Sequence, residues 1–374
     1  MKKELNKTYT PGSHPDLPPP VRTTGLLAWM KINLFSSPLN IFLSLFSLWI
    51  IWNVMPPILN WVLFDAVWNA NSRAECWGQM SYPREGACWA FIKGSFQLFI
   101  YGWYPELERW RVNISAILLA LAIFGLLKDQ LPGKKYWIIY ASLFPFIAGW
   151  LLIGGFGLTP VPTNKFGGIL LTIIIGVTGI AFSLPIGIIL ALGRKSRLPA
   201  LQSICIIFIE FIRGVPLITL LFMASTMLSY FLPPGTTFDL LVRVLIVVTL
   251  FSSAYIAEVI RGGLQGLPTG QYEAADSLGL GYWKAHQLII LPQALKISIP
   301  GIVNTFIGLY KDTTLVLIIG MMDIVGLGRA RLGDSLWQGL AGEVYLFIAI
   351  FFFICCFSMS RYSINLEKKL STGH

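Results

Sequence analysis

Residues 270–295 read GQYEAADSLGLGYWKAHQLIILPQAL and form a polar, partly charged segment between two apolar spans. The run Glu273-Ala274-Ala275 is typical of a helix, and its two alanines are small enough to let another backbone approach closely. Three residues separate this run from Gly279. The helix is predicted to end there, because glycine adopts the left-handed conformation of the C′ position without strain.

The second half of this segment leads back into an apolar span. Nine residues separate Gly279 from the run Ile289-Ile290-Leu291-Pro292. Proline lacks an N–H and its ring clashes with the preceding turn, so the helix before Pro292 cannot continue unchanged. The pattern predicts a bent, compact, solvent-exposed element, and an ordinary amphipathic loop between two spans is the alternative.

The composition of the 374-residue chain indicates a polytopic membrane protein. Hydrophobic residues make up 55% of it and charged residues only 12%, about half the charged share of soluble domains. The formal net charge is +10. We assign this charge to lysines and arginines that hold cytoplasmic loops against anionic lipid, and not to nucleic-acid binding.

The hydropathy pattern predicts an all-α fold with about eight transmembrane helices, since a spanning helix needs about twenty mostly apolar residues. The eight segments are residues 39–63, 111–128, 136–155, 167–192, 200–231, 238–261, 297–320 and 341–364. The fifth segment is longer than one span requires and is interrupted by Arg213-Gly214-Val215-Pro216. We expect it to be bent or to lie partly in the membrane interface.

Basic residues in the short loops predict the orientation of the chain. With eight spans, the basic groups fall on one side: Lys128, Lys134, Lys135, Arg194, Lys195, Arg197, Arg361, Lys368 and Lys369. Both termini are then cytoplasmic, and the loop at 268–292 lies on the same side. Residues 1–37, which are polar and proline-rich, and residues 367–374 are expected to be cytoplasmic tails.

The long polar loop at 65–110 falls on the opposite, periplasmic side and is rich in tryptophan. Amphipathic rings of this kind favour the level of the lipid headgroups. Cys76 and Cys88 both lie in this loop. They can form a disulfide if the loop faces an oxidising compartment, and two free thiols are the alternative.

The residues of a catalytic, phosphate-binding or metal-binding site are not found in the sequence. The string Gly193-Arg194-Lys195-Ser196 lacks the spaced glycine and the Gly-Lys pair of a phosphate-binding loop. The three histidines are scattered, which argues against a metal site. We expect a chain that binds no cofactor and is not an enzyme by itself, so any ATP hydrolysis belongs to a partner.

Charged residues inside the apolar spans are candidates for a substrate path, because a charge within a bilayer is costly unless it is paired. Glu258 and Arg261 are three residues apart and can pair on one helix face, as can Glu210 and Arg213. Such pairs either neutralise each other and fix helix register, or meet the ammonium and carboxylate of an amino acid.

A further group, Lys311-Asp312-Thr313, interrupts the segment at 297–320. Adjacent residues of a helix point in different directions, so Lys311 and Asp312 pair poorly with each other. This favours a role in the substrate path or at a subunit interface. The substrate-path candidates are Arg213, Glu258, Arg261, Lys311, Asp312 and Thr313.

Several motifs together resemble the polar-amino-acid branch of ABC importer permeases over about residues 165–366. They are Arg213-Gly214-Val215-Pro216-Leu217, Ala254-Tyr255-Ile256-Ala257-Glu258, Arg261-Gly262-Gly263, the loop from Glu273 to Pro292, and Lys311-Asp312-Thr313. Val215 stands where threonine is usual in this branch. The strings at 86–92 and 104–112 resemble the larger membrane subunit of general L-amino-acid importers.

The resemblance implies a permease in the bacterial inner membrane that moves L-amino acids. It implies a second homologous permease subunit, two ATPase subunits that bind ATP and Mg, and a periplasmic amino-acid-binding protein. The loop at 268–292 would dock on the ATPase. The coupling residues would be Glu273, Ala274, Ala275, Gly279, Ile289, Leu291 and Pro292.

The same resemblance divides the chain into an N-terminal three-helix extension at 38–160 and a five-helix transport domain at 165–366. Two other functions remain open at this point. One is an ion-coupled secondary carrier, which would use acidic residues inside the spans but leave the loop at 268–292 without a role. The other is a structural half of a permease heterodimer that does not itself contact substrate.

Overall fold

A computed structural model describes residues 25–79, 86–128, 131–231, 233 and 238–370. These residues are mostly helical and include no β-strand. By their internal contacts they form two compact units. The smaller unit contains residues 25–67 with 86–87, and the larger unit contains residues 68–79 with 88–370.

The smaller unit consists of α1 (Leu26–Asn33) and α2 (Pro38–Leu59), followed by a π-helical turn at Asn60–Phe64. The Ser37 side chain caps α2 by accepting a hydrogen bond from the Asn40 N–H at 3.2 Å. No residue of α2 is buried, and the helix is apolar all round, as expected of a helix in lipid. Helix α1 falls within the predicted tail at 1–37, whose first 24 residues lie outside the described part.

The larger unit contains the remaining helices. In chain order they are α3 (Arg73–Gln79), α4 (Trp89–Tyr101), α5 (Arg109–Leu127), α6 (Lys134–Ile153), α7 (Gly168–Arg194), α8 (Pro199–Gly214), α9 (Leu217–Phe222), α10 (Leu240–Gln265), α11 (Thr269–Ser277), α12 (Tyr282–Ala285), α13 (Leu291–Asp312), α14 (Ile324–Leu332) and α15 (Ala341–Leu370). Short 3-10 turns lie at Glu106–Glu108, Thr163–Lys165, Leu228–Phe231 and Thr313–Ile319, and π-turns at Met223–Met227 and His286–Ile290.

The predicted all-α fold with about eight spans is confirmed. Within the described residues, seven helices are long and apolar enough to cross a membrane, and a bent pair makes up to eight. The bend is where the sequence indicated it: Pro199–Gly214 and Leu217–Met227 meet at 103°. Val215 and Pro216 are both extended, which ends one helix and starts the next. At the C-terminus α15 continues to Leu370, into the predicted tail, and residues 371–374 are outside the described part.

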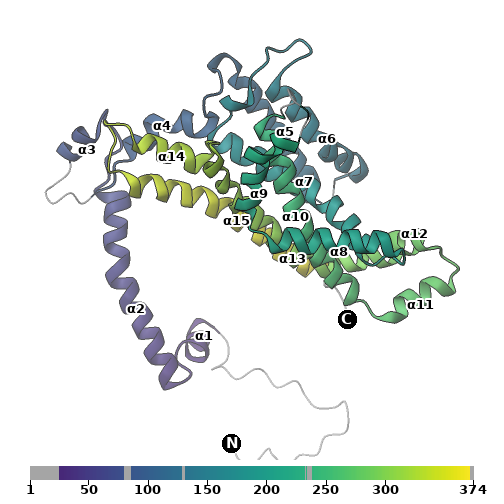
Figure 1. Cartoon of the computed structure of the whole chain (residues 1–374). Coiled ribbons are helices and arrows are strands. Elements are labelled where there is room, and N and C mark those ends of the chain that lie inside the picture. Colours follow the sequence, from purple (N-terminus) through teal and green to yellow (C-terminus); the bar gives the residue numbers. More distant parts are fainter. Residues whose placement is uncertain (1–24, 80–85, 129–130, 232, 234–237, 371–374) are drawn as a thin grey trace, which may run out of the picture. The chain divides into compact units, whose positions relative to one another are not determined.

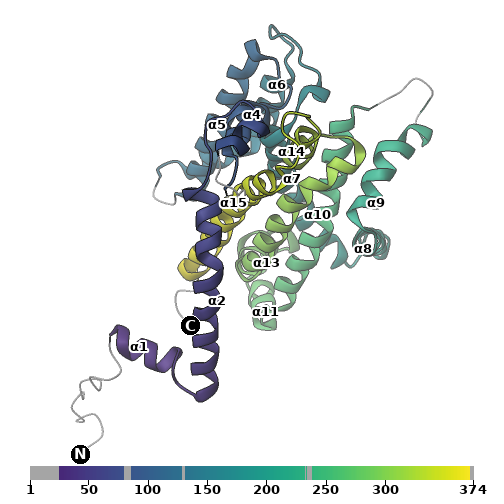
Figure 2. The same cartoon turned by 90° about the vertical axis from the view of Figure 1, so that its left-hand side faces the viewer.

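The core of the larger unit forms around α10, which packs against α7, α8 and α13, while α13 also packs against α15. Buried apolar side chains such as Ile175, Val248 and Ile256 fill the contacts between these helices. Helices α5 and α6 pack as a pair. Within this unit α4 and α14 lie at one end, and α11 and α12 lie at the opposite end (Figures 1 and 2).

Candidate functional site

The segment that the sequence singled out consists of two short helices between two long ones. Helix α10 ends at Gln265, α11 and α12 follow, and α13 begins at Leu291. Figure 1 shows α11 and α12 projecting at one end of the larger unit. The structure therefore contains the bent, compact and exposed element expected from the sequence.

A Schellman turn ends α11, and Gly279 is its left-handed residue. Gly279 has φ +66°, its N–H donates to the Asp276 carbonyl at 2.9 Å, and the Leu280 N–H donates to the Ala275 carbonyl at 3.2 Å. No other atom lies within 4 Å of the position that a Cβ would take. Glycine is therefore favoured by the backbone conformation and not by lack of space.

One face of the segment is anchored to the rest of the larger unit. Ala275 is 1% exposed and Ile290 is fully buried, packed with the apolar residues of α10 and α13. The Tyr272 hydroxyl donates to the Leu264 carbonyl at 3.0 Å, and Gln293 donates to the Gln271 side chain at 2.9 Å. These contacts fix the two short helices on the ends of α10 and α13.

The opposite face is open to solvent. Glu273 and Ala274 are exposed, and large apolar side chains accompany them: Leu278 is 72% exposed and Trp283 is 73% exposed. Ala275 does not contribute to this exposed face, because its side chain packs inward where α11 lies against its own unit. Of the other predicted coupling residues, Pro292 is exposed, and Ile289 and Leu291 are partly buried.

A cluster of five charged side chains joins α7, α8 and α10 near this segment. It consists of Arg194, Glu210, Arg213, Glu258 and Arg261. Arg194 lies 2.8 Å from Glu210 and 3.4 Å from Glu258, and Arg213 lies 3.6 Å from Glu258 and 4.0 Å from Glu210. Arg261 pairs with Glu258, its Nε donating at 2.9 Å. We call these five residues the charged cluster.

The charged cluster goes beyond the two separate pairs expected from helical spacing. Arg194, assigned from sequence only to a positive loop, is in the last turn of α7 and contacts both glutamates. The next residue, Lys195, donates to the Tyr272 hydroxyl at 2.9 Å and so joins the cluster to α11. Three guanidinium groups face two carboxylates, leaving one positive charge in excess.

The second group of substrate-path candidates is separate from the charged cluster. Helix α13 ends at Asp312, and the chain continues as a 3-10 turn. Thr313 is fully buried, with its hydroxyl donating to the Tyr310 carbonyl at 2.8 Å, whereas Lys311 is exposed and Asp312 partly exposed. Lys311 has no ion-pair partner in the described part of the chain.

At the other end of the larger unit, Cys76 and Cys88 are joined by a disulfide with their Cα atoms 6.0 Å apart. Both cysteines are fully buried. Arg73 holds the same region to the start of α15, because its Nη1 donates to the Gln338 carbonyl at 2.7 Å. The Cys88 N–H donates to the buried Glu343 carboxylate at 3.0 Å.

Arg111 at this end is 2% exposed and was not identified from sequence as a structural residue. Its two terminal nitrogens donate to the Thr159 carbonyl at 2.7 Å and to the Thr159 hydroxyl at 2.6 Å. It also pairs with Glu108 at 2.7 Å, and the Thr159 hydroxyl donates to Glu108. The three residues hold the start of α5 against the segment that follows α6.

Asp323 is a second residue that sequence did not single out. It is fully buried and caps α14, with one carboxylate oxygen accepting the Gly326 N–H at 2.9 Å. The other oxygen has no hydrogen-bond partner. Burial raises the pKa of the Asp323 carboxyl to about 6, although the backbone N–H groups that donate to it act in the opposite direction. An aspartate before an apolar helical run is a sequence signal of a cap, but its burial is not visible there.

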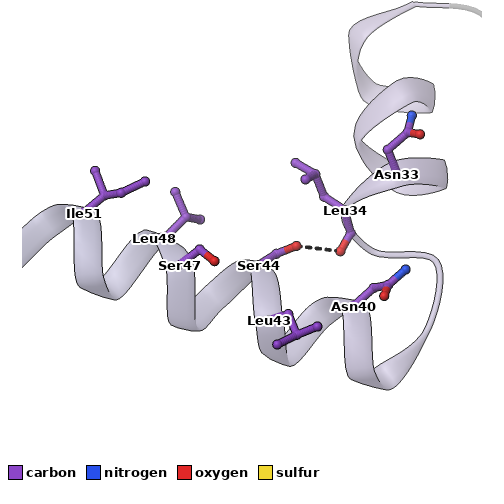
Figure 3. Close-up of a pocket in the computed structure, with 8 residues that line it drawn as sticks. All are labelled: Asn33, Leu34, Asn40, Leu43, Ser44, Ser47, Leu48 and Ile51. Atoms are coloured by element: carbon purple, nitrogen blue, oxygen red, sulfur yellow. Dashed lines mark hydrogen bonds between the residues drawn. The ribbon is translucent and has the colours of Figure 1, made fainter. Parts of the chain in front are cut away.

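The smaller unit contains a cleft between α1 and α2 (Figure 3). In this cleft the Ser44 hydroxyl donates to the Leu34 carbonyl at 2.9 Å and holds the two helices at an angle. None of the described residues that line the cleft is charged. In the described residues of the whole chain there is also no group of three or more His, Cys, Asp or Glu that could hold a metal.

Residues 183–372 match a family described as "Binding-protein-dependent transport system inner membrane component". The chain is 48% identical over 363 residues to the inner membrane amino-acid ABC transporter permease protein YhdY of Escherichia coli (strain K12), covering 96% of this chain and 97% of that protein. It is 45% identical over 428 residues to the glutamate/glutamine/aspartate/asparagine transport system permease protein BztC of Rhodobacter capsulatus, covering 96% of each.

A shorter relative matches only about half of the chain. The probable amino-acid permease protein YxeN of Bacillus subtilis (strain 168) is 32% identical over 201 residues, covering 54% of this chain and 88% of that protein. These matches confirm the resemblance that the motifs indicated. The chain belongs to the binding-protein-dependent transport family of inner membrane components, the permeases of ABC transporters.

Proposed function

We propose that the chain is the permease subunit of an ATP-driven importer that moves L-amino acids across the inner membrane. The names of its two full-length relatives support this substrate class, and one of them is a permease for glutamate, glutamine, aspartate and asparagine. In this proposal residues 268–292 receive mechanical work from a separate ATPase. The observation that carries it is the geometry of α11 and α12, which are anchored on one face and exposed on the other.

The attachment of this segment explains how a force applied to it by an ATPase would be transmitted to the transmembrane helices. A Cβ on Gly263 of α10 would lie 2.5 Å from the Ala294 carbonyl oxygen of α13, so the two backbones are in direct contact. The Ser298 hydroxyl donates across the same contact to the Val259 carbonyl at 3.3 Å. Because α10 and α13 carry the two ends of the segment, they would move together as one rigid pair.

The charged cluster is the proposed start of the substrate path on the α11 side. Arg213 offers a guanidinium to a substrate carboxylate, and Glu258 offers a carboxylate to its ammonium. Arg213 Nε has no partner among the described residues, and the side chains of the cluster are 20–53% exposed, so they can exchange partners. Lys311, Asp312 and Thr313 would line the path separately, on α13.

The proposed complex contains a second homologous permease, two ATPase subunits and a periplasmic amino-acid-binding protein. ATP and Mg would bind to the ATPases, so that this chain is not an enzyme and binds no cofactor. Both termini would be cytoplasmic. The extension at 38–160 would precede a transport domain at 165–366, in keeping with the shorter relative that matches 54% of the chain.

The coupling role is tested with Glu273→Arg and Gly279→Val in the complete complex, reconstituted in proteoliposomes that contain ATP. We expect uptake of labelled amino acid to fall at least about tenfold, which corresponds to about 1.4 kcal/mol of lost docking energy. Both proteins should still reach the membrane, as measured by immunoblotting. Normal ATP-driven uptake by both variants would refute the role.

Two matched variants separate docking from folding. Gly279→Asn should keep most of the uptake, because asparagine tolerates the left-handed conformation that valine does not. Glu106→Arg changes a carboxylate that is 80% exposed at the other end of the larger unit and should leave uptake unchanged. Equal losses in all four variants would show that the assay reports folding and not coupling.

A further inference from the structure

The turn between α6 and α7 displays one apolar side chain in an unusual backbone conformation. Residues 154–157 read Gly-Gly-Phe-Gly, and all four have positive φ. Phe156 has φ +50°, in the left-handed region that non-glycine residues seldom adopt, and is 99% exposed. A strained residue with a side chain that contacts nothing in its own chain indicates a contact outside it.

The base of this turn is held by internal hydrogen bonds. Gly155 and Leu158 exchange two N–H···O hydrogen bonds of 3.0 and 3.2 Å, and the Val161 N–H donates to the Ile153 carbonyl at 2.8 Å. The Trp150 indole N–H donates to the Gly155 carbonyl at 3.1 Å. Among the described residues, the backbones of Phe156 and Gly157 at the tip of the turn find no hydrogen-bond partner. The turn therefore suits the partly hydrated headgroup region and not the hydrocarbon core, where unpaired backbone groups would be costly.

Phe156 lies close in sequence to an exposed apolar face of α6. Phe146, Trp150 and Ile153 lie on one face of this helix and are 63%, 44% and 44% exposed. Helix α6 is one of the candidate membrane spans, so this apolar face is a lipid-facing surface. Trp150 lies near the end of the span, where tryptophan is favoured at the membrane interface. Phe156 follows three residues after the last residue of α6.

The charge pattern distinguishes lipid from a protein partner or water. No charged residue occurs between Lys135 and Lys165, so the uncharged run begins in the first turn of α6 and continues through the turn at 154–157. A loop that projects into water, or meets a soluble protein, normally carries polar and charged side chains around its apolar anchors. Here the first charge comes nine residues after Phe156.

We propose that Phe156 inserts into the lipid interface beside the ends of α5 and α6 and anchors the turn at 154–157 there. The partner is the boundary between headgroups and acyl chains of one membrane leaflet, which accommodates aromatic rings. The buried contacts of Arg111 with Thr159 connect this turn to α5, so the anchor holds both helices. The inference depends on α6 spanning the bilayer and is independent of the proposed import function.

The test measures the depth of residue 156 in the complete complex. Cys205, Cys355 and Cys356 are replaced by alanine, the Cys76–Cys88 disulfide is kept, and Phe156→Cys is labelled with bimane in nanodiscs of brominated phosphatidylcholine. Asn164→Cys is the matched control, because Asn164 is exposed in the same connection and precedes Lys165. We expect quenching by brominated lipid to be roughly threefold or more stronger at 156 than at 164.

Three results would overturn the proposal. The first is that aqueous iodide quenches the bimane fluorescence equally at residues 156 and 164, while brominated lipid quenches neither. Another is loss of lipid quenching at 156 when the periplasmic binding protein is added, since the turn would then be a docking site for that protein. The third comes from the unmodified chain: a diazirine reagent dissolved in the bilayer should label peptide 154–158, and labelling of α6 without this peptide would exclude insertion.

Discussion

The two ends of the larger unit are held together by different kinds of interaction. At the end with α4 and α14, the contacts are a disulfide, a backbone bond between Gly168 and Met322, and an arginine that is 2% exposed. At the end with α11 and α12, the helices meet through the charged cluster, whose side chains are 20–53% exposed. Buried bonds are costly to break and partly hydrated ion pairs are not. The helix contacts at the first end are therefore suited to staying intact, and the ion pairs at the second end to breaking and re-forming with other partners.

The largest expected effect is at Arg111. Arg111→Ala removes the positive charge that pairs with Glu108, which keeps only the Thr159 hydroxyl as a donor, and leaves the Thr159 carbonyl without its donor. We therefore expect the free energy of unfolding to fall by about 3–5 kcal/mol. Arg109→Ala is the control, because Arg109 pairs with a carboxylate that is 80% exposed, and should cost less than about 1 kcal/mol. Denaturant unfolding in a constant detergent measures both. If both variants lost the same free energy of unfolding, the buried pair of Arg111 would be no more stabilising than the exposed pair of Arg109.

Asp323 provides a pH-dependent test of the same end. Its pKa in the folded protein is about 6, above the ordinary value of 3.8, so the folded state binds the proton more tightly than the unfolded state. The stabilisation is complete below about pH 4 and is lost as the pH rises through about 6, with a loss of up to about 3 kcal/mol. We expect the unfolding temperature of the wild type to fall over this range.

Asp323→Asn keeps an oxygen for the Gly326 N–H and replaces the unpartnered oxygen by a neutral amide. Between pH 4 and pH 7 this variant should lose less stability than the wild type. Asp334→Asn is the comparison, because Asp334 pairs with Arg331 at 2.8 Å and is partly exposed. If Asp323→Asn and the wild type have parallel pH profiles, the buried carboxylate is not the group that titrates.

The smallest expected effect on stability is at the charged cluster. Glu258→Gln leaves three guanidinium groups with one carboxylate, but the site is partly hydrated, so we expect a loss of about 1 kcal/mol. We expect Glu258→Gln to change the number of ATP molecules hydrolysed per amino acid imported, while the free energy of unfolding stays close to that of the wild type. Glu210→Gln, at a side chain that is 53% exposed, is the weaker matched variant. If Glu258→Gln lowered the free energy of unfolding as much as Arg111→Ala, the two ends of the larger unit would be held together equally strongly.

Local sequence patterns predicted the features that depend on a few neighbouring residues. The spans follow from apolar runs, the bend from Val215-Pro216, and the end of α11 from Gly279. The contacts of Arg194 with Glu210 and Glu258 could not be predicted, since they join three helices that are distant in sequence. The inward position of Ala275 likewise depends on which face of α11 meets its own unit.

The buried polar residues show the same limit. Arg111 pairs with Glu108 at a helical spacing that can be recognised in the sequence. Its other partner, Thr159, lies 48 residues further along the chain, after both α5 and α6. The burial of Asp323 depends on how the start of α7 crosses the start of α14, where Gly168 and Asp323 form a bridge. These arrangements are set by packing and not by any local motif.

The bond between Cys76 and Cys88 also bears on biogenesis. Thiols pair in the periplasm and stay reduced in the cytosol. If both termini are cytoplasmic, as proposed, Cys76 and Cys88 face the periplasm. A molecule inserted in the opposite orientation would then keep both thiols, and α3 would lack its covalent link to the start of α4. With the proposed orientation, the disulfide distinguishes correctly inserted molecules from inverted ones. A thiol-reactive mass tag applied after denaturation would label five cysteines in a molecule that lacks the disulfide and three in a molecule that has it.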